Sequence, residues 1–185
     1  TVGIVGTGKI GLCFARILHG FGAKLLAHDL VPNPEAGQLG IEYVALDRLL
    51  AESDIISLHC PLTPATHHLI GPAALARMRT GVYLLNTGRG PLVDTAAVIE
   101  ALKSGKLGAL ALDVYEEEEG IFYEDLSAAF VPDDLLARLL TFPNVLVTSH
   151  QAFFTREALT SIATTTAGNL DDFAAGRACA NSLKP

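Results

Sequence analysis

The chain has 185 residues, of which 50% are hydrophobic and 18% are charged. This composition excludes intrinsic disorder and collagen-like sequence, and it predicts a globular chain that buries one substantial core. The formal net charge of -7 argues against a general nucleic-acid-binding or membrane-binding protein, because both need basic surfaces.

Short apolar runs rich in strand-forming residues alternate with helical patterns along the chain. The runs predicted as strands are Val2–Val5, Lys24–His28, Glu42–Ala45, Asp54–Cys60, Val82–Asn86, Ala109–Val114 and Val145–Thr148. Some are apolar at consecutive positions, as at 83–85, which is typical of parallel strands covered on both faces. The alternation predicts right-handed βαβ units and therefore an α/β fold, a Rossmann-type doubly wound parallel sheet with flanking helices.

Helices are predicted between these strands from apolar residues spaced three and four positions apart. The first runs from Ile10 to Phe21 and ends near Gly22, and a later one has Asp94 as its N-cap and Gly105 as its C-cap. Two more are predicted at 71–79 and 133–140, and one long C-terminal helix at about 155–175. The irregular stretch 116–131 is too long for an ordinary connection, so we expect it to be functional.

A glycine-rich loop follows the first predicted strand and opens the first predicted helix. It reads Gly6-Thr7-Gly8-Lys9-Ile10-Gly11, a G-x-G-x-x-G pattern. Gly6 would permit the tight turn, Gly8 the approach of a pyrophosphate to the backbone, and Gly11 close packing of helix and strand. The amides at the helix N-terminus would bind the anion, which even an acidic protein can do.

Asp29 ends the second predicted strand, 18 residues beyond Gly11, where dinucleotide-binding folds carry an acidic residue. It would accept hydrogen bonds from the adenosine ribose and repel a 2′-phosphate. Because no Arg or Lys follows it before Arg48, the sequence favours NAD over NADP. The alternative is that the glycines only make a turn and that Asp29 is a surface carboxylate.

Three kinds of polar group are predicted at the carboxyl edge of the sheet, where ligands bind in such folds. Arg89 follows the strand at 82–86, the acidic run Glu116–Glu119 follows the strand at 109–114, and His150 follows the last strand. Taken singly, each could be a surface ion pair, a solvated loop or a structural histidine. Their convergence at one edge favours a catalytic site.

The chemistry of these groups is complementary. Arg89, between two glycines, can hold a carboxylate in a bidentate fork. His150 can donate and accept a proton, and a Glu beside it would favour the imidazolium that protonates a carbonyl oxygen. With NADH, this set predicts reduction of a 2-keto acid.

The other histidines and the cysteines carry weaker signals. We interpret His67 and His68 as structural and expect no metal site, because adjacent side chains rarely point the same way. Cys60-Pro61 would lie beside the adenine or simply pack. An odd number of cysteines without a C-x-x-C pair favours a reducing cytoplasm, and no apolar run reaches the roughly 18 residues of a membrane span.

Several segments together resemble the D-isomer-specific 2-hydroxyacid dehydrogenases, and the fermentative D-lactate dehydrogenase branch in particular. They are the glycine-rich loop, Ser57–Thr63, Leu85–Asp94, Asp113–Glu118, Phe122–Asp125 and Ser149–Phe153. The resemblance covers essentially all 185 residues. It implies an NAD-dependent enzyme that interconverts a 2-keto acid and a D-2-hydroxy acid, with pyruvate and D-lactate as the first expectation.

The resemblance also implies roles for single residues. Arg89 corresponds to the arginine that binds the substrate carboxylate, His150 to the general acid and base, and Glu118 to the carboxylate that orients it. Spacing alone leaves the choice among Glu116–Glu119 open. The implied cofactor contacts are Gly6, Gly8, Lys9, Ile10, Gly11, Asp29, Cys60, Pro61, Thr66, Thr87, Gly88, Arg89 and Asp113.

Two departures accompany the resemblance. Ser149 stands where Gly or Pro is commoner before the histidine. The substrate domain of the family is built from sequence before the glycine-rich loop and after the long helix, so we expect residues 1–185 to be one NAD(P)-binding Rossmann domain with the substrate domain largely absent. The start at Thr1, directly in an apolar run, is interpreted as a domain boundary or truncation.

Alternative functions remain open at this point. A dehydrogenase for another 2-hydroxy acid fits the same motifs, and so does a non-catalytic NAD-sensing protein like the corepressor relatives of the family. The segment Phe122–Asp125 favours the enzyme. In either case the expected partners are a small acid and further copies of the chain in a homodimer or higher homo-oligomer, without nucleic acid or membrane.

Overall fold

The computed structural model describes residues 1–123, 125 and 130–182. The chain divides into two compact units, Thr1–His150 and Gln151–Pro185.

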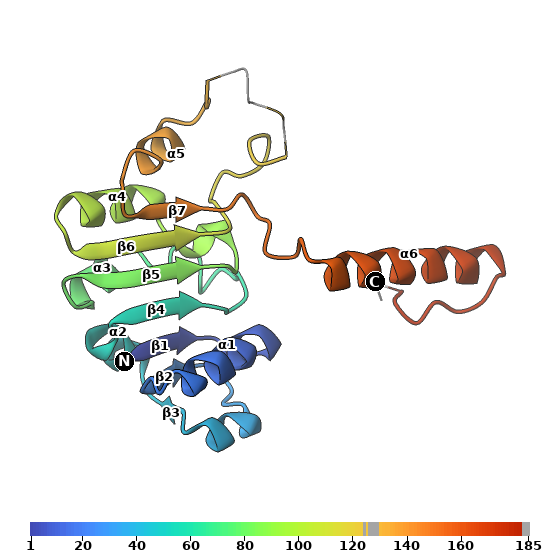
Figure 1. The fold of residues 1–185 in the computed structure, drawn as a ribbon, viewed down its shortest axis with the longest axis horizontal. Coiled ribbons are helices and arrows are strands. Elements are labelled where there is room, and N and C mark those ends of the chain that lie inside the picture. The colour runs from blue at the N-terminus through green and yellow to red at the C-terminus, as the bar shows by residue number, and fades with distance from the viewer. Residues whose placement is uncertain (124, 126–129, 183–185) are drawn as a thin grey trace. The chain divides into compact units, whose positions relative to one another are not determined.

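The first unit is built on a parallel sheet in the order β3-β2-β1-β4-β5-β6-β7 (Figure 1). The strands are β1 (Val2–Val5), β2 (Leu25–His28), β3 (Glu42–Tyr43), β4 (Ile55–Leu58), β5 (Val82–Asn86), β6 (Leu107–Leu112) and β7 (Val145–Val147). Neighbouring strands pair in parallel throughout. The predicted doubly wound α/β fold is confirmed. Each predicted strand is present: Val2–Val5 and Val82–Asn86 have the predicted bounds, and the other five have shifted ends.

Helices connect the strands. They are α1 (Lys9–Gly20), α2 (Leu46–Glu52), α3 (Pro72–Arg77), α4 (Thr95–Lys103) and α5 (Asp134–Leu139), with 3-10 helices η1 (Pro34–Leu39) and η2 (Gly90–Leu92). Asp94 caps α4 by accepting a hydrogen bond from the amide of Ala97, as predicted. The C-cap of α4 is Ser104, and Gly105 follows it with a φ of 72°.

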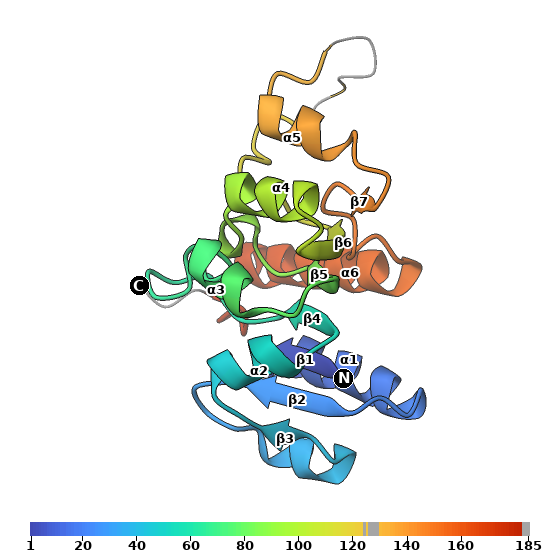
Figure 2. The same ribbon diagram turned by 90° about the vertical axis from the view of Figure 1, so that its left-hand side faces the viewer.

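Two hydrophobic cores lie on opposite faces of the sheet, and Figure 2 shows α1 and α2 on these two sides. Successive strand residues point to opposite faces, so Val2 and Ile4 pack with α1 residues such as Leu12. Leu26, Ile56, Leu58 and Leu84 pack in the larger core with residues of α2, α3, α4 and α5. This alternation explains the continuous apolar runs in the sequence.

The expectation that strand 83–85 is covered on both faces was wrong at Tyr83, whose side chain is 51% exposed. Leu146 on β7 is also exposed. In the first unit, α1 contacts β1, β2 and η1, and Ala36 of η1 belongs to the same core, so α1 and η1 cover the half of the sheet where β1 and β2 lie.

Parallel pairing puts the carboxyl ends of all these strands at one edge of the sheet. The chain order reverses between β1 and β4, which are neighbours in the sheet. Ligands of open α/β sheets bind in the crevice at such a switch point. The loops that follow β1, β2, β4, β5, β6 and β7 therefore form the candidate site.

The second unit consists mainly of α6 (Arg156–Ala174), which begins after Thr155, as predicted. The hydroxyl of Thr155 accepts a hydrogen bond from the amide of Ala158 and caps the helix. The apolar side chains of α6 are exposed, from 39% at Leu159 to 81% at Phe173. None of the helices in the described part of the chain combines the length and apolar character that crossing a membrane requires.

Candidate active site

The glycine-rich loop has the geometry that its sequence predicts. Gly6 has a φ of 95°, and a Cβ there would lie 2.5 Å from the backbone nitrogen of Cys60. A Cβ on Gly11 would lie 2.0 Å from the carbonyl oxygen of Gly6. Only glycine fits these two positions without a backbone shift, and together they hold the start of α1 against the end of β1.

Gly8 is different, because a Cβ built on it would meet nothing within 4 Å. Gly8 is also the N-cap of α1 and offers no side chain to cap the helix. The amides of the first turn, which include those of Lys9 and Ile10, have no acceptor within the helix. Open space in front of free amides fits a bound pyrophosphate.

Asp29 lies at the end of β2 and is bound to the glycine-rich loop. Its Oδ2 accepts hydrogen bonds from the amide of Thr7 at 2.6 Å and from the hydroxyl of Thr7 at 2.9 Å. Partial burial on its own raises the pKa of Asp29. The two hydrogen bonds from Thr7 and the weaker ones from Val31 and Leu30 lower the pKa, and their combined effect is larger than that of burial. The net effect lowers the pKa, so Asp29 is a carboxylate at neutral pH.

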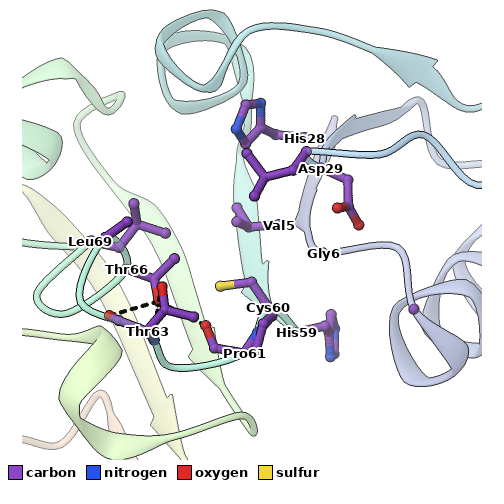
Figure 3. A pocket seen from close by; sticks show the side chains of 13 residues that line it. Val5, Gly6, His28, Asp29, His59, Cys60, Pro61, Thr63, Thr66 and Leu69 are labelled. Carbon is purple, nitrogen blue, oxygen red and sulfur yellow. Dashed lines mark hydrogen bonds between the residues drawn. The ribbon is translucent and has the colours of Figure 1, made fainter.

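A pocket of about 390 Å³ lies between Asp29 and the loop after β4. It is lined by Val5, Gly6, Gly8, His28, Asp29, Leu30, His59, Cys60, Pro61, Thr63, Ala65, Thr66 and Leu69. Figure 3 shows the sulfur of Cys60 pointing into the space between these residues. Apolar walls with a carboxylate at one side fit an adenosine, whose base is apolar on its faces and whose ribose carries hydroxyls.

The loop after β4 is held by Thr66 and His59. The Thr66 hydroxyl donates to the carbonyl of Pro61 at 2.8 Å and accepts from the amide of Thr63 at 2.8 Å. Burial lowers the pKa of His59 to about 4, so its ring is neutral near pH 7 and lies 2.9 Å from the Ser57 hydroxyl. Burial also raises the pKa of the Cys60 thiol, which is therefore no ready nucleophile.

A second, more open cavity of about 600 Å³ continues from this pocket toward β5. It is lined by Ile10, His59, Cys60, Pro61, Leu62, Thr87, Gly88 and Arg89. The structure therefore brings Ile10 and the predicted contacts at 87–89 around one space. A dinucleotide has two halves, and the two adjoining cavities offer room for both.

Asn86 shapes the loop that carries Arg89. Its buried side chain accepts a hydrogen bond from the amide of Gly88 at 3.0 Å and donates one to the carbonyl of Arg89 at 2.9 Å. The Arg89 guanidinium is exposed and donates to the carbonyl of Gly88 at 2.7 Å. Within the described residues it forms no ion pair, which leaves its charge available for an anionic ligand.

Glu118 and His150 are in direct contact. Oε1 of Glu118 lies 2.8 Å from Nδ1 of His150, and Oε2 accepts from the amide of Tyr115 at 3.0 Å. The hydroxyl of Tyr123 lies 3.0 Å from the same Nδ1. Among the described residues nothing hydrogen-bonds to Nε2 of His150. An ionised carboxylate only accepts, so Nδ1 carries a proton and Nε2 is left for a ligand.

The backbone at His150 turns sharply. Ser149 and His150 have φ values of 53° and 54°, in the left-handed region that non-glycine residues rarely adopt. The amide of His150 donates to the carbonyl of Asp113. Asp113 is buried at the end of β6, and its Oδ1 accepts from the Thr148 hydroxyl at 2.5 Å. The ends of β6 and β7 are thereby bound together.

His67 and His68 lie outside this arrangement. Contrary to the expectation that adjacent side chains diverge, their rings lie side by side with centroids 4.0 Å apart. Nε2 of His68 lies 2.5 Å from Oε1 of Glu116, so Glu116 pairs with His68 and Glu118 with His150. In residues 1–123, 125 and 130–182 no three His, Cys, Asp or Glu side chains are grouped so that they could hold a metal ion.

Two residues near the site, Thr7 and Tyr43, could not be identified from the sequence, although they hydrogen-bond in the group that holds Asp29. Tyr123, which belongs to the segment Phe122–Asp125, contacts His150. Thr7 stands at a variable position of the glycine pattern, and Tyr43 reaches it only through the pairing of β3 with β2.

Comparison with known proteins agrees with this geometry. Residues 1–152 match the family described as "D-isomer specific 2-hydroxyacid dehydrogenase, NAD binding domain". A protein of Aspergillus oryzae called 2-hydroxyacid dehydrogenase A is 60% identical over 183 residues, which make up 99% of this chain and 52% of that protein. The D-lactate dehydrogenase of Escherichia coli is 53% identical over 183 residues, which make up 99% of this chain and 56% of that protein.

A solved structure from work on the pyruvate reductase of Chlamydomonas reinhardtii is also similar. It superposes with a TM-score of 0.93 at 50% identity and covers 97% of this chain and 55% of that one. The chain thus spans about half the length of the proteins that it matches.

Proposed function

Because the chain belongs to the D-isomer specific 2-hydroxyacid dehydrogenase family and matches its NAD binding domain, we propose that it is the cofactor-binding part of an oxidoreductase. The proposed reaction interconverts a 2-keto acid and a D-2-hydroxy acid, with pyruvate and D-lactate as the pair. The observation that carries this proposal is the contact of Glu118 with His150 at the sheet edge where the glycine-rich loop lies.

The cofactor, when bound, supplies or accepts a hydride at the C2 atom of the substrate. The first-turn amides of α1 would hold its pyrophosphate, and Oδ1 of Asp29 would accept from its ribose. Thr87, Gly88 and Asp113 would lie toward its nicotinamide half. The openness at Gly8 and the two adjoining cavities support the placement of the pyrophosphate, Asp29, Thr87 and Gly88, whereas Asp113 lines neither cavity.

The remaining steps belong to side chains of this chain. Arg89 would bind the substrate carboxylate, because its guanidinium is exposed and free of ion pairs among the described residues. Nε2 of His150 would give a proton to the carbonyl oxygen during reduction and take it back during oxidation. Glu118 would hold the ring and stabilise the imidazolium through Nδ1.

Substrate identity is the finer part of the proposal. The printed names of the relatives include a D-lactate dehydrogenase and a pyruvate reductase, which support pyruvate, and a 2-hydroxyacid dehydrogenase, which leaves a different acid as the alternative. The test is NADH oxidation by the product of the complete gene, with pyruvate and with bulkier 2-keto acids. Turnover of bulkier acids alone would contradict pyruvate. Absence of turnover with all of them would contradict the enzyme.

We also propose a cytoplasmic homo-oligomer. The three cysteines are free, as is usual in a reducing compartment. Exposed apolar side chains on α6 support self-association, because contiguous apolar surface of a soluble protein commonly marks an interface. Light scattering of the purified protein measures the oligomeric state, and a monomer at micromolar concentration would contradict this part.

A further inference from the structure

A continuous chain of hydrogen bonds runs behind the glycine-rich loop. The amide of Asn33 donates to the Tyr43 hydroxyl at 2.8 Å, and this hydroxyl donates to the Thr7 hydroxyl at 2.8 Å. The Thr7 hydroxyl then donates to Oδ2 of Asp29 at 2.9 Å. This series of hydrogen bonds joins a loop residue, the end of β3, the glycine-rich loop and the end of β2.

The direction of every bond in this chain is fixed by its two ends. A backbone amide can only donate, and an ionised carboxylate can only accept. The hydroxyls of Tyr43 and Thr7 between them must therefore each accept from one side and donate to the other. This leaves neither hydroxyl free to rotate toward a ligand.

Thr7 is held from several directions at once. Its side chain is almost fully buried, at 2% exposure, and its carbonyl accepts from Nδ2 of Asn33 at 3.0 Å. Its amide also donates to Oδ2 of Asp29, so that oxygen already has two strong donors. Oδ1 of Asp29 accepts a long bond of 3.4 Å from the amide of Val31. Oδ1 is therefore the oxygen with acceptor capacity left for a ribose.

We propose that Tyr43 is a positioning residue for the cofactor, which orients the Asp29 carboxylate through Thr7 without touching the ligand. Tyr43 is not among the described residues that line the pocket, whereas Asp29 is. The inference rests on the proposed placement of the adenosine ribose at Asp29. Because Tyr43 lies on β3, recognition of the ribose would then also depend on this strand of only two residues.

The first test measures NAD binding to the product of the complete gene by titration calorimetry. Tyr43→Phe should raise the Kd about fivefold, the effect of one ordinary hydrogen bond. Tyr83→Phe is the matched control, because Tyr83 is exposed on β5 and lies outside the chain of bonds, and it should bind NAD like the original chain. An unchanged Kd in Tyr43→Phe would overturn the proposal.

A pair of variants at position 7 tests the same path at its middle. Thr7→Ser keeps the hydroxyl and should retain most of the affinity. Thr7→Val has nearly the shape of threonine but no hydroxyl, and it should weaken NAD binding at least as much as Tyr43→Phe. Equal affinities of the two variants would overturn the proposal.

A double-mutant cycle with Asp29→Asn distinguishes an effect of Tyr43 on the Asp29 carboxylate from a general loss of local structure. If Tyr43 acts through Asp29, Tyr43→Phe should weaken NAD binding far less in the Asp29→Asn background than alone. Full additivity would mean that Tyr43 acts elsewhere and would overturn the inference. If Asp29→Asn alone leaves NAD binding unchanged, the proposed placement of the ribose at Asp29 is wrong, and the inference about Tyr43 is then wrong as well.

The NMR signal of the Asp29 carboxyl carbon, followed as a function of pH, gives a measurement that does not depend on NAD binding. In Tyr43→Phe its midpoint of titration should move up toward the ordinary aspartate range, because the Thr7 hydroxyl is no longer fixed. A midpoint that stays in place would contradict the path through Thr7.

Discussion

Gly90 lies so close to Tyr115 that a Cβ at position 90 would stand 1.9 Å from the carbonyl oxygen of Tyr115. The loop that carries Arg89 therefore rests directly on the segment that leads to Glu118. Only a residue without a side chain permits this contact, which couples the ends of β5 and β6.

Gly90→Ala should accordingly destabilise the first unit by about 3 kcal/mol, because two backbone segments must separate to admit the methyl group. Urea denaturation measures the change. Gly20→Ala is the control, since a Cβ at position 20, the last residue of α1, meets nothing within 4 Å. That variant should be neutral or up to about 1 kcal/mol more stable, owing to the better helix propensity of alanine. Equal stabilities of the two variants would refute the steric argument.

Glu118→Gln should lower kcat for 2-keto acid reduction by about a hundredfold, because an amide cannot stabilise the imidazolium of His150. Steady-state kinetics of the complete protein measure this loss. Affinity for NADH should stay within about twofold, since Glu118 lines neither cofactor cavity. Glu117→Gln, one residue away and exposed, should keep full activity. A Glu118→Gln enzyme with unchanged kcat would remove Glu118 from the mechanism.

Asp29→Ala should weaken NAD binding about tenfold and reduce the preference for NAD over NADP. The reason is loss of both the ribose acceptor and the charge that repels a 2′-phosphate. Titration with each nucleotide gives the ratio of the two Kd values. Asp47→Ala, which removes an exposed carboxylate on α2, should leave the ratio alone. If the ratio is the same in all three proteins, Asp29 does not select the cofactor.

His59 should make the fold sensitive to acid. Burial lowers its pKa from 6.5 to about 4, so between these pH values the unfolded chain binds a proton that the folded chain does not. Stability therefore falls as the pH drops from about 6.5 to about 4, by at most about 3 kcal/mol from this group.

Urea denaturation across that pH range checks the prediction. His59→Gln should have a flatter pH profile than the original chain, whereas His19→Gln, on the exposed side of α1, should not. Carboxylates contribute equally in each protein, so the difference between profiles isolates the histidine. Parallel profiles for His59→Gln and the original chain would contradict the assigned cause.

The sheet and most helices could be predicted from the sequence because buried parallel strands leave continuous apolar runs, as at Leu84 and Leu110. Helix α2 was not predicted. It has seven residues and begins after Ala45, which offers no side-chain cap to mark its start. The exposure of Tyr83 also escaped prediction, since a run of apolar letters does not reveal which face of a strand has a covering helix.

The site could be predicted only in part for a similar reason. The glycine pattern and the strand-end positions of Asp29, Arg89 and His150 follow from local sequence. The choice of Glu118 over Glu116 depended on resemblance, because the sequence shows two identical side chains and their different roles follow from long-range partners, His150 and His68. The contact of Tyr43 with Thr7 spans 36 residues and arises from strand pairing, which no local pattern encodes.

The hydrogen bond from the amide of Tyr115 to Glu118 would matter for the proposed turnover. It arises within one short loop, so the carboxylate is aligned before any ligand arrives. Ordering a free glutamate side chain costs up to about 2 kcal/mol of conformational entropy. This cost is met once, on folding, so in the proposed mechanism each catalytic cycle would begin from a preorganised acid–base pair.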